Sequence, residues 1–151
     1  MKPLTNFQAQ CLTWIEPLIA DKPWLPPSYI MAHVRIESGW DPSIKASDFA
    51  STGSVGLMQV SAPAIDQVGA IGQDQTDPQV SLATGIAYIA WLRSFLMFRW
   101  GFKDSILYRP VCMAYNEGPG NVLNGRRDNV YYLKWAAAQQ GYAFVDGLMA
   151  P

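Results

Sequence analysis

The chain has 151 residues, of which 50% are hydrophobic and 15% charged, and its formal net charge is −1. This length and composition predict one globular domain over residues 1–151 and exclude a disordered chain. The near-neutral charge argues against a strongly basic nucleic-acid-binding protein, so no nucleic-acid partner is expected.

The first half of the chain is expected to contain two helices and a long loop. An amphipathic pattern predicts a helix over Phe7–Ile19. A second helix is predicted over Pro27–Ser38, because proline is tolerated in a first helical turn. The segment Asp41–Val55 is rich in Ser, Asp, Gly and Thr, and it is expected to be loop with at most a short β-hairpin.

The next segments predict a short helix and then a long one. Ser61 is suited to cap the short helix. Asp77 followed by Pro78 is a start signal for a helix that reaches Trp100. Its most apolar run, Ile86–Trp100, is too short to span a bilayer and is interpreted as a buried core helix, so no membrane span is expected.

The last third is also expected to be helical. A short apolar helix is predicted over Pro110–Tyr115, and Gly118–Gly120 is expected to be a turn. Asp128 is suited to cap a last helix over Asn129–Gln140, with Gly141 past its end. The elements together predict a mainly α-helical fold.

The cysteines and the N-terminus bear on cellular location. Cys11 and Cys112 have neither metal-like nor CxxC spacing and are expected to be buried free thiols. Residues 1–6 lack the apolar run and cleavage site of a signal peptide. The protein would therefore work inside the cell, be exported by another route, or have lost its signal.

Glu37 is the residue best suited to chemistry. It follows Ile30 by seven residues and therefore shares an edge with the apolar face of its helix. A carboxyl group against apolar walls keeps its proton to higher pH and can act as a general acid. Taken alone, however, Glu37 would more simply be a surface residue at a helix end.

Three segments, taken together, resemble the soluble lytic transglycosylase family, whose members cleave peptidoglycan and share a lysozyme-like fold. The segments are Ile36–Pro42, Gly53–Gln59 and Ala114–Val122, and they occur in the family's order. The resemblance covers roughly Pro27–Ala136. It implies a lysozyme-like helical domain with an active-site cleft.

The resemblance implies that Glu37 is the single general acid/base. It would protonate the leaving oxygen of the β-1,4 bond after N-acetylmuramic acid and then take the proton of the C6 hydroxyl, leaving a 1,6-anhydro end. Ordinary glycosidases need two carboxylates, whereas this reaction does not require a second carboxylate. No cofactor or metal is implied, and His33, the only histidine, is expected to be a packing residue.

The family motifs also imply a set of substrate-binding residues. Ser38 is expected to orient the substrate or the active-site loop by hydrogen bonding. A hydrogen bond to the backbone of its own helix is a nearly equal alternative. Met58 is expected to line the cleft beneath a sugar ring, and Gln59 is expected to bond an acetamido or hydroxyl group. The complete set is Ser38, Met58, Gln59, Tyr115, Asn116 and Tyr132.

The later motifs are expected to lie close to the acid. Tyr115 matches a family tyrosine that bonds the catalytic carboxyl or the substrate. Asn116 is expected to brace its loop, with a sugar contact as the less favoured alternative. Tyr132 is preferred over the adjacent Tyr131 as the tyrosine that closes the cleft floor beside Glu37.

Two alternative functions stay open. One is a hydrolytic muramidase, as in goose-type lysozymes, with Asp41 or Asp48 assisting a water nucleophile; the long segment Lys45–Ser51, which is expected to rim the cleft, would supply Asp48. The other is a non-catalytic wall-binding component of a virion or secretion apparatus. An intact Glu37 motif makes that second alternative the least favoured. The expected partners are peptidoglycan glycan strands, with a phage or secretion machine as further candidates, and a monomer is expected. The expected place of action is the periplasm, reached by lysis, by virion delivery, or with a signal that is absent from this chain.

Overall fold

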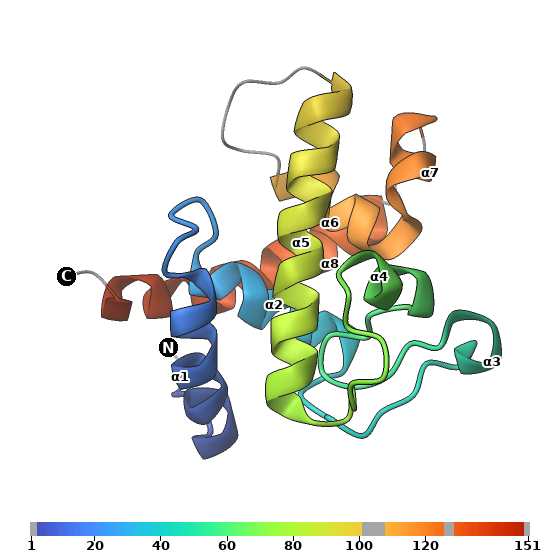
Figure 1. Ribbon diagram of the computed structural model, residues 1–151. Helices are drawn as coiled ribbons and strands as arrows, with labels where there is room; N and C mark the ends of the chain where they lie inside the picture. Colours follow the sequence, from blue (N-terminus) through green and yellow to red (C-terminus); the bar gives the residue numbers. More distant parts are fainter. Residues whose placement is uncertain (1–2, 101–107, 126–128, 150–151) are drawn as a thin grey trace.

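The computed structural model describes residues 3–100, 108–125 and 129–149. Within these residues the chain forms helices and no named strand, which confirms the predicted mainly α-helical class (Figure 1). The elements are α1 (Asn6–Ile19), α2 (Pro27–Glu37), α3 (Phe49–Thr52), α4 (Ala62–Gln67), α5 (Pro78–Trp100), α6 (Tyr108–Glu117), α7 (Pro119–Leu123), α8 (Asn129–Tyr142) and the 3₁₀ helix η1 (Ala143–Met149).

Helix α1 begins one residue earlier than predicted because a capping box closes its first turn. Thr5 Oγ1 accepts from the backbone N–H of Gln8 at 3.2 Å, and the Gln8 side chain accepts from the Thr5 backbone at 3.0 Å. The inner face of α1 packs against α2 and α5, with Ile15 fully buried. Cys11 and Cys112 are both buried, and neither is in a disulfide, as predicted.

Helix α2 lies at the centre of the fold. All its residues from Pro27 to Val34 are buried. Helix α8 packs along it, with the ring centroids of Tyr29 and Trp135 4.6 Å apart. At its start, Ser28 Oγ donates to the Asp146 carboxylate of η1 at 2.7 Å. These contacts hold α2 firmly, so the residue at its C-terminus has a fixed position.

Helix α5 is the longest element and crosses the molecule (Figure 1). It starts where the sequence predicts, since Asp77 Oδ1 accepts from the backbone N–H groups of Gln79 and Val80 at 2.8 and 3.2 Å. The helix is long and apolar enough to cross a membrane by length and composition, but half of that apolar window is buried inside the fold. It therefore packs as a core helix.

Two predictions for the last third of the chain are wrong, each by about one helical turn. Helix α6 starts before Pro110, which lies in its first turn, where a missing N–H does no harm. The expected turn over Gly118–Gly120 is instead the start of α7. Gly118 supplies a positive φ of 84° as the N-cap, and Pro119 takes the first helical position.

The other differences concern helix ends. Helix α8 continues through Gly141, because the hydroxyl of Tyr142 accepts from Trp40 Nε1 at 3.0 Å and fixes this end of the helix. Ser61 precedes α4 at the capping position, but its side chain makes no capping bond. The predicted cap Asp128 lies outside the described residues.

The segment predicted to be loop rims one side of the molecule and contains only the four-residue helix α3. Isolated bridges join Val55 to Lys45 and to Val60, so no full hairpin forms in it. Gly56 follows this segment directly, and its position in the fold requires a glycine. Its φ is +84°, and a Cβ atom at this position would lie 1.9 Å from the carbonyl oxygen of Gln75.

Candidate active site

Glu37 is the last residue of α2 and is partly buried. Burial raises the pKa of its carboxyl from the ordinary 4.5 to about 7, and a hydrogen bond from the Tyr131 hydroxyl opposes that rise. This burial comes mainly from the packing of α2 against α8, with α6 reaching α2 through the contact between the His33 and Tyr115 rings. A carboxyl with this pKa carries its proton in an appreciable fraction of molecules at neutral pH.

Tyr131, not Tyr132, lies beside Glu37. The hydroxyl of Tyr131 donates to Glu37 Oε1. The expectation that Tyr132 occupies this place is wrong, because consecutive residues of a helix point roughly 100° apart. The ring of Tyr132 instead stacks on that of Trp135, with 5.9 Å between the ring centroids. The Arg109 guanidinium lies 5.2 Å from the centroid of the Tyr132 ring.

His33 extends this hydrogen-bonded chain into the core. Its ring is fully buried, one helical turn before Glu37, and its Nδ1 lies 3.3 Å from the Tyr131 hydroxyl. Burial lowers the pKa of His33 to about 3, so the imidazole is neutral. Because Tyr131 gives its single proton to Glu37, His33 Nδ1 must be the donor to Tyr131. The other ring nitrogen, Nε2, is then an acceptor, and it has no hydrogen-bond partner.

The segment Gly53–Gln59, called the glycine loop below, precedes α4. It places one predicted residue near the surface and another in the core. Gln59 has a φ of +47°, and its Nε2 donates to the carbonyl oxygens of Ile44 and Gly56 at 2.9 and 2.8 Å. Met58 is fully buried, and its side chain fills the space beside Gly85 of α5, where a Cβ atom would lie 2.6 Å from Met58 Cε. The prediction that Met58 lines the cleft is therefore wrong.

Tyr115 and Asn116 lie at the end of α6. The Tyr115 hydroxyl donates to the Met58 carbonyl oxygen at 2.7 Å and so ties α6 to the glycine loop. Asn116 is exposed. Ser38 is buried, its Oγ donates to the Val34 carbonyl at 3.1 Å, and it accepts from the Trp40 N–H at 3.2 Å. These bonds make Ser38 part of the turn after α2.

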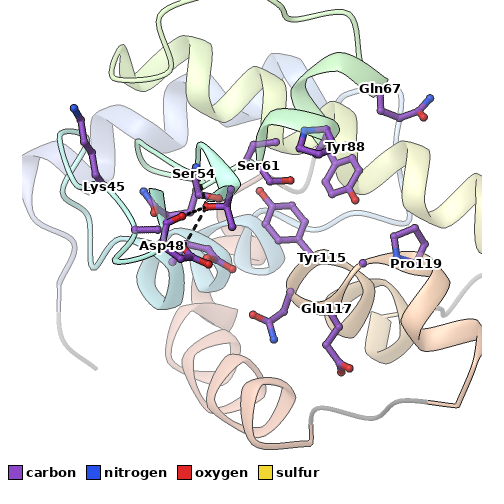
Figure 2. A pocket seen from close by; sticks show the side chains of 18 of the residues that line it. Lys45, Asp48, Ser54, Ser61, Gln67, Tyr88, Tyr115, Glu117 and Pro119 are labelled. Carbon is purple, nitrogen blue, oxygen red and sulfur yellow. Dashed lines mark hydrogen bonds between the residues drawn. The ribbon is translucent and has the colours of Figure 1, made fainter. Parts of the chain in front are cut away.

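A groove of about 780 Å³ begins at Glu37 and runs between the loop segment and α6–α7. Figure 2 shows Asp48 and Ser54 on the loop side and Glu117 on the other, with Tyr115 between them. The predicted rim segment thus lines the groove through residues 45–48. Gln59, Tyr115 and Asn116 also line it, whereas Ser38 and Met58 are not among its lining residues.

A second hollow of about 680 Å³ adjoins the first. Both hollows share Glu37 and Asn116, and the second is otherwise formed by the end of α2 and the exposed side of α8. The carboxyl of Glu37 therefore lies where two open spaces meet. An extended polymer laid across both would pass the carboxyl at an internal bond.

Sequence reasoning missed the aromatic wall of the groove. Tyr88 and Trp91 of α5 line it with their rings parallel to within 8° and 5.8 Å apart. Tyr88 also contacts Tyr115 at 5.5 Å between centroids. Their i, i+3 spacing on a helix was a usable signal, since it places two aromatic rings on one face. Among the described residues, no group of three or more His, Cys, Asp or Glu side chains could hold a metal ion.

Comparisons with known proteins agree with this architecture. Residues 18–137 match the model of the transglycosylase SLT domain. Two soluble lytic murein transglycosylases, from Escherichia coli K12 and O157:H7, are each 26% identical over 144 residues, which cover 83% of this chain and 20% of theirs. The chain thus spans about a fifth of the length of these relatives.

The fold is also found in a solved structure. The crystal structure of the 70 kDa soluble lytic transglycosylase from Escherichia coli superimposes with a TM-score of 0.55 at 23% identity, over 85% of this chain and 21% of that one. At this identity the similarity shows a shared fold. Together with the domain match, which spans most of the chain, it identifies this protein as a member of the transglycosylase SLT domain family.

Proposed function

We propose that this chain is a peptidoglycan lytic transglycosylase domain in which Glu37 is the single general acid/base. The observation that carries the proposal is the position of Glu37 at the meeting point of two hollows, with its pKa raised to about 7. The family match and the names of the relatives support peptidoglycan as the substrate.

The first step is protonation of the leaving group. Cleavage of the β-1,4 bond between N-acetylmuramic acid and N-acetylglucosamine expels a sugar hydroxyl, which is a poor leaving group as an alkoxide. The protonated Glu37 carboxyl gives its proton to the bridging oxygen as the bond to C1 breaks. A carboxyl with the ordinary pKa of 4.5 would hold almost no proton at neutral pH, so the environment of Glu37 matters for the rate.

The second step returns the carboxyl to its starting state. The ionised Glu37 takes the proton of the C6 hydroxyl, and the C6 oxygen forms a bond to C1 of the same muramic sugar. The product is a 1,6-anhydro ring, and no water is consumed. Because the nucleophile belongs to the substrate, one carboxyl suffices for both proton transfers.

Tyr131 and His33 are assigned the role of holding the Glu37 carboxyl in both protonation states. While Glu37 is ionised, Tyr131 donates to it and His33 Nδ1–H donates to Tyr131. When Glu37 gains a proton on its other carboxyl oxygen, both bonds keep their direction, because Oε1 of the protonated carboxyl still accepts from Tyr131. Neutral His33 carries its single ring proton on Nδ1 in both states, so the Tyr131 hydroxyl stays oriented toward Glu37.

The remaining motif residues receive separate roles in the proposal. Tyr115 is assigned to the wall of the groove, where its bond to the Met58 carbonyl orients the glycine loop. Asn116, which is exposed and lines both hollows, is assigned to contact the sugar next to the scissile bond. Gln59 contacts substrate from the loop side. Ser38 is assigned to stabilise the turn after α2, and Met58 is assigned to anchor the glycine loop in the core.

The position of Asp48 favours the second candidate function, a hydrolytic muramidase. Its side chain lines the same groove as Glu37, so it could assist a water nucleophile. Asp41, the other carboxylate considered, is exposed and is not among the lining residues of either hollow. Asp48→Asn separates the mechanisms: cleavage at near wild-type rate supports the single-acid reaction, and a loss comparable to that of Glu37→Gln supports the muramidase.

The proposal is tested by the release of soluble fragments from purified peptidoglycan. Glu37→Gln should keep its circular dichroism spectrum and lose cleavage almost completely, because glutamine cannot donate a proton. The matched control is Glu117→Gln, the same substitution on the far side of the groove. Substantial cleavage by folded Glu37→Gln would overturn the single-acid proposal.

A further inference from the structure

The second hollow has a distinct charge. Besides Glu37, the charged side chains that line it are Arg35, in the last turn of α2, and Lys134, on α8. Both are exposed cations. The larger groove on the other side of Glu37 is mixed in sign, with Lys45, Asp48 and Glu117 among its lining residues. The two halves of the site therefore differ in what they can bind.

Neither cation is neutralised by the protein. Among the described residues, no ion pair or hydrogen bond of the Arg35 or Lys134 side chain is found. Burial raises the pKa of Glu37 and the Tyr131 bond lowers it. The two cations thus line the hollow without an ion-pair partner among the described residues.

We propose that this hollow binds the carboxylate-bearing peptide stem of peptidoglycan, held by Arg35 and Lys134. The inference rests on the proposed function. Where a stem is attached, the glycan sugars are uncharged, because the lactyl carboxyl of the muramic residue is bonded to the stem as an amide. The negative charge that a cationic hollow would meet there is carried by the carboxylates of the stem. The stem is attached to the muramic sugar whose bond would lie at Glu37, which places it close to this hollow.

The lining of the hollow suits a peptide as well as a charge. Arg35 presents a planar fork that can bond one carboxylate through two N–H groups, while Lys134 offers a single rotatable cation. Ile36 and Val130 add apolar surface to the lining of the hollow, and Val130 is 64% exposed. A peptide segment with a carboxylate and an aliphatic side chain would meet both features.

The test measures binding, so it does not depend on turnover. Glu37→Gln protein is titrated by calorimetry with uncrosslinked glycan strands that carry their stems, and with the same strands stripped of stems by an amidase. Adding Arg35→Gln and Lys134→Gln should weaken binding of the stem-bearing strands about fivefold, the size expected for two exposed charge contacts, and change binding of the stripped strands little.

Arg99→Gln is the matched control, because Arg99 is also an exposed arginine in the last turn of a helix but lies outside both hollows. Equal affinities with and without the two cations would overturn the proposal. An equal loss for stem-bearing and stripped strands would also overturn it, because the cations would then hold the lactyl carboxylate that the amidase frees, or the sugar itself, and not the stem. If wild-type protein cleaves peptidoglycan while either result is obtained, the proposed function stands and only the stem site fails.

Discussion

Replacing Glu37 by glutamine should change how stability depends on pH, because the folded protein disfavours the charged carboxyl. Burial raises the pKa of Glu37 from 4.5 to about 7. Between these values the folded protein holds more protons than the unfolded chain, so the free energy of unfolding falls as the pH rises. The stabilisation by the protonated carboxyl is complete below the unfolded pKa and is lost as the pH passes the folded one.

The size of the effect follows from the two pKa values. At about 1.36 kcal/mol per pKa unit, the interval from 4.5 to about 7 corresponds to about 3 kcal/mol of unfolding free energy. Glutamine does not ionise, so Glu37→Gln lacks this loss while every other titrating group is shared with the wild type. The variant should therefore gain about 3 kcal/mol relative to the wild type between roughly pH 4 and pH 8.

Urea unfolding at several pH values measures this difference directly. The same substitution at Glu16, in α1 and outside both hollows, is the control for a general effect of removing a glutamate. A constant offset between Glu37→Gln and wild type at all pH values would refute the reasoning, since Glu37 would then titrate alike in the folded and unfolded states.

Three further substitutions test other parts of the account. Tyr131→Phe removes a hydrogen bond that lowers the pKa of Glu37, so the alkaline limb of the kcat/KM profile should move up by about 1 pH unit, and an unmoved limb would contradict the assigned bond. Gly56→Ala should lower the free energy of unfolding by roughly 2 kcal/mol or more, because its Cβ would meet the Gln75 carbonyl at 1.9 Å; a wild-type urea midpoint would show that the loop adjusts freely. Thr5→Ala should cost about 1 kcal/mol through loss of the cap, measured by thermal unfolding, with activity per folded molecule unchanged.

Local signals in the sequence were sufficient where the structural cause lies within a few residues. Asp77 and Pro78 mark the start of α5 because the aspartate bonds the first free N–H groups of that helix. Glu37 was placed at the end of an apolar helix face from spacing alone. The mainly helical class followed from the same kind of pattern.

Features fixed by contacts between helices could not be predicted in this way. Whether Tyr131 or Tyr132 faces Glu37 depends on the rotation of α8 against α2, which neighbouring residues do not determine. The burial of Met58 depends on the missing side chain of Gly85, on a helix far along the chain. Helix α8 passes Gly141 for a similar reason, because contacts of the next residue outweigh the local stop signal.

The measurement that tests the central claim most directly is the mass of the fragments that the wild-type protein releases from purified peptidoglycan. If Glu37 acts alone with the C6 hydroxyl as nucleophile, the muramic ends are 1,6-anhydro rings, and each fragment is lighter than its hydrolysed counterpart by the mass of one water. Fragments with ordinary reducing ends would contradict the claim, because water would then be the nucleophile and a second group, with Asp48 as the first candidate, would have to activate it.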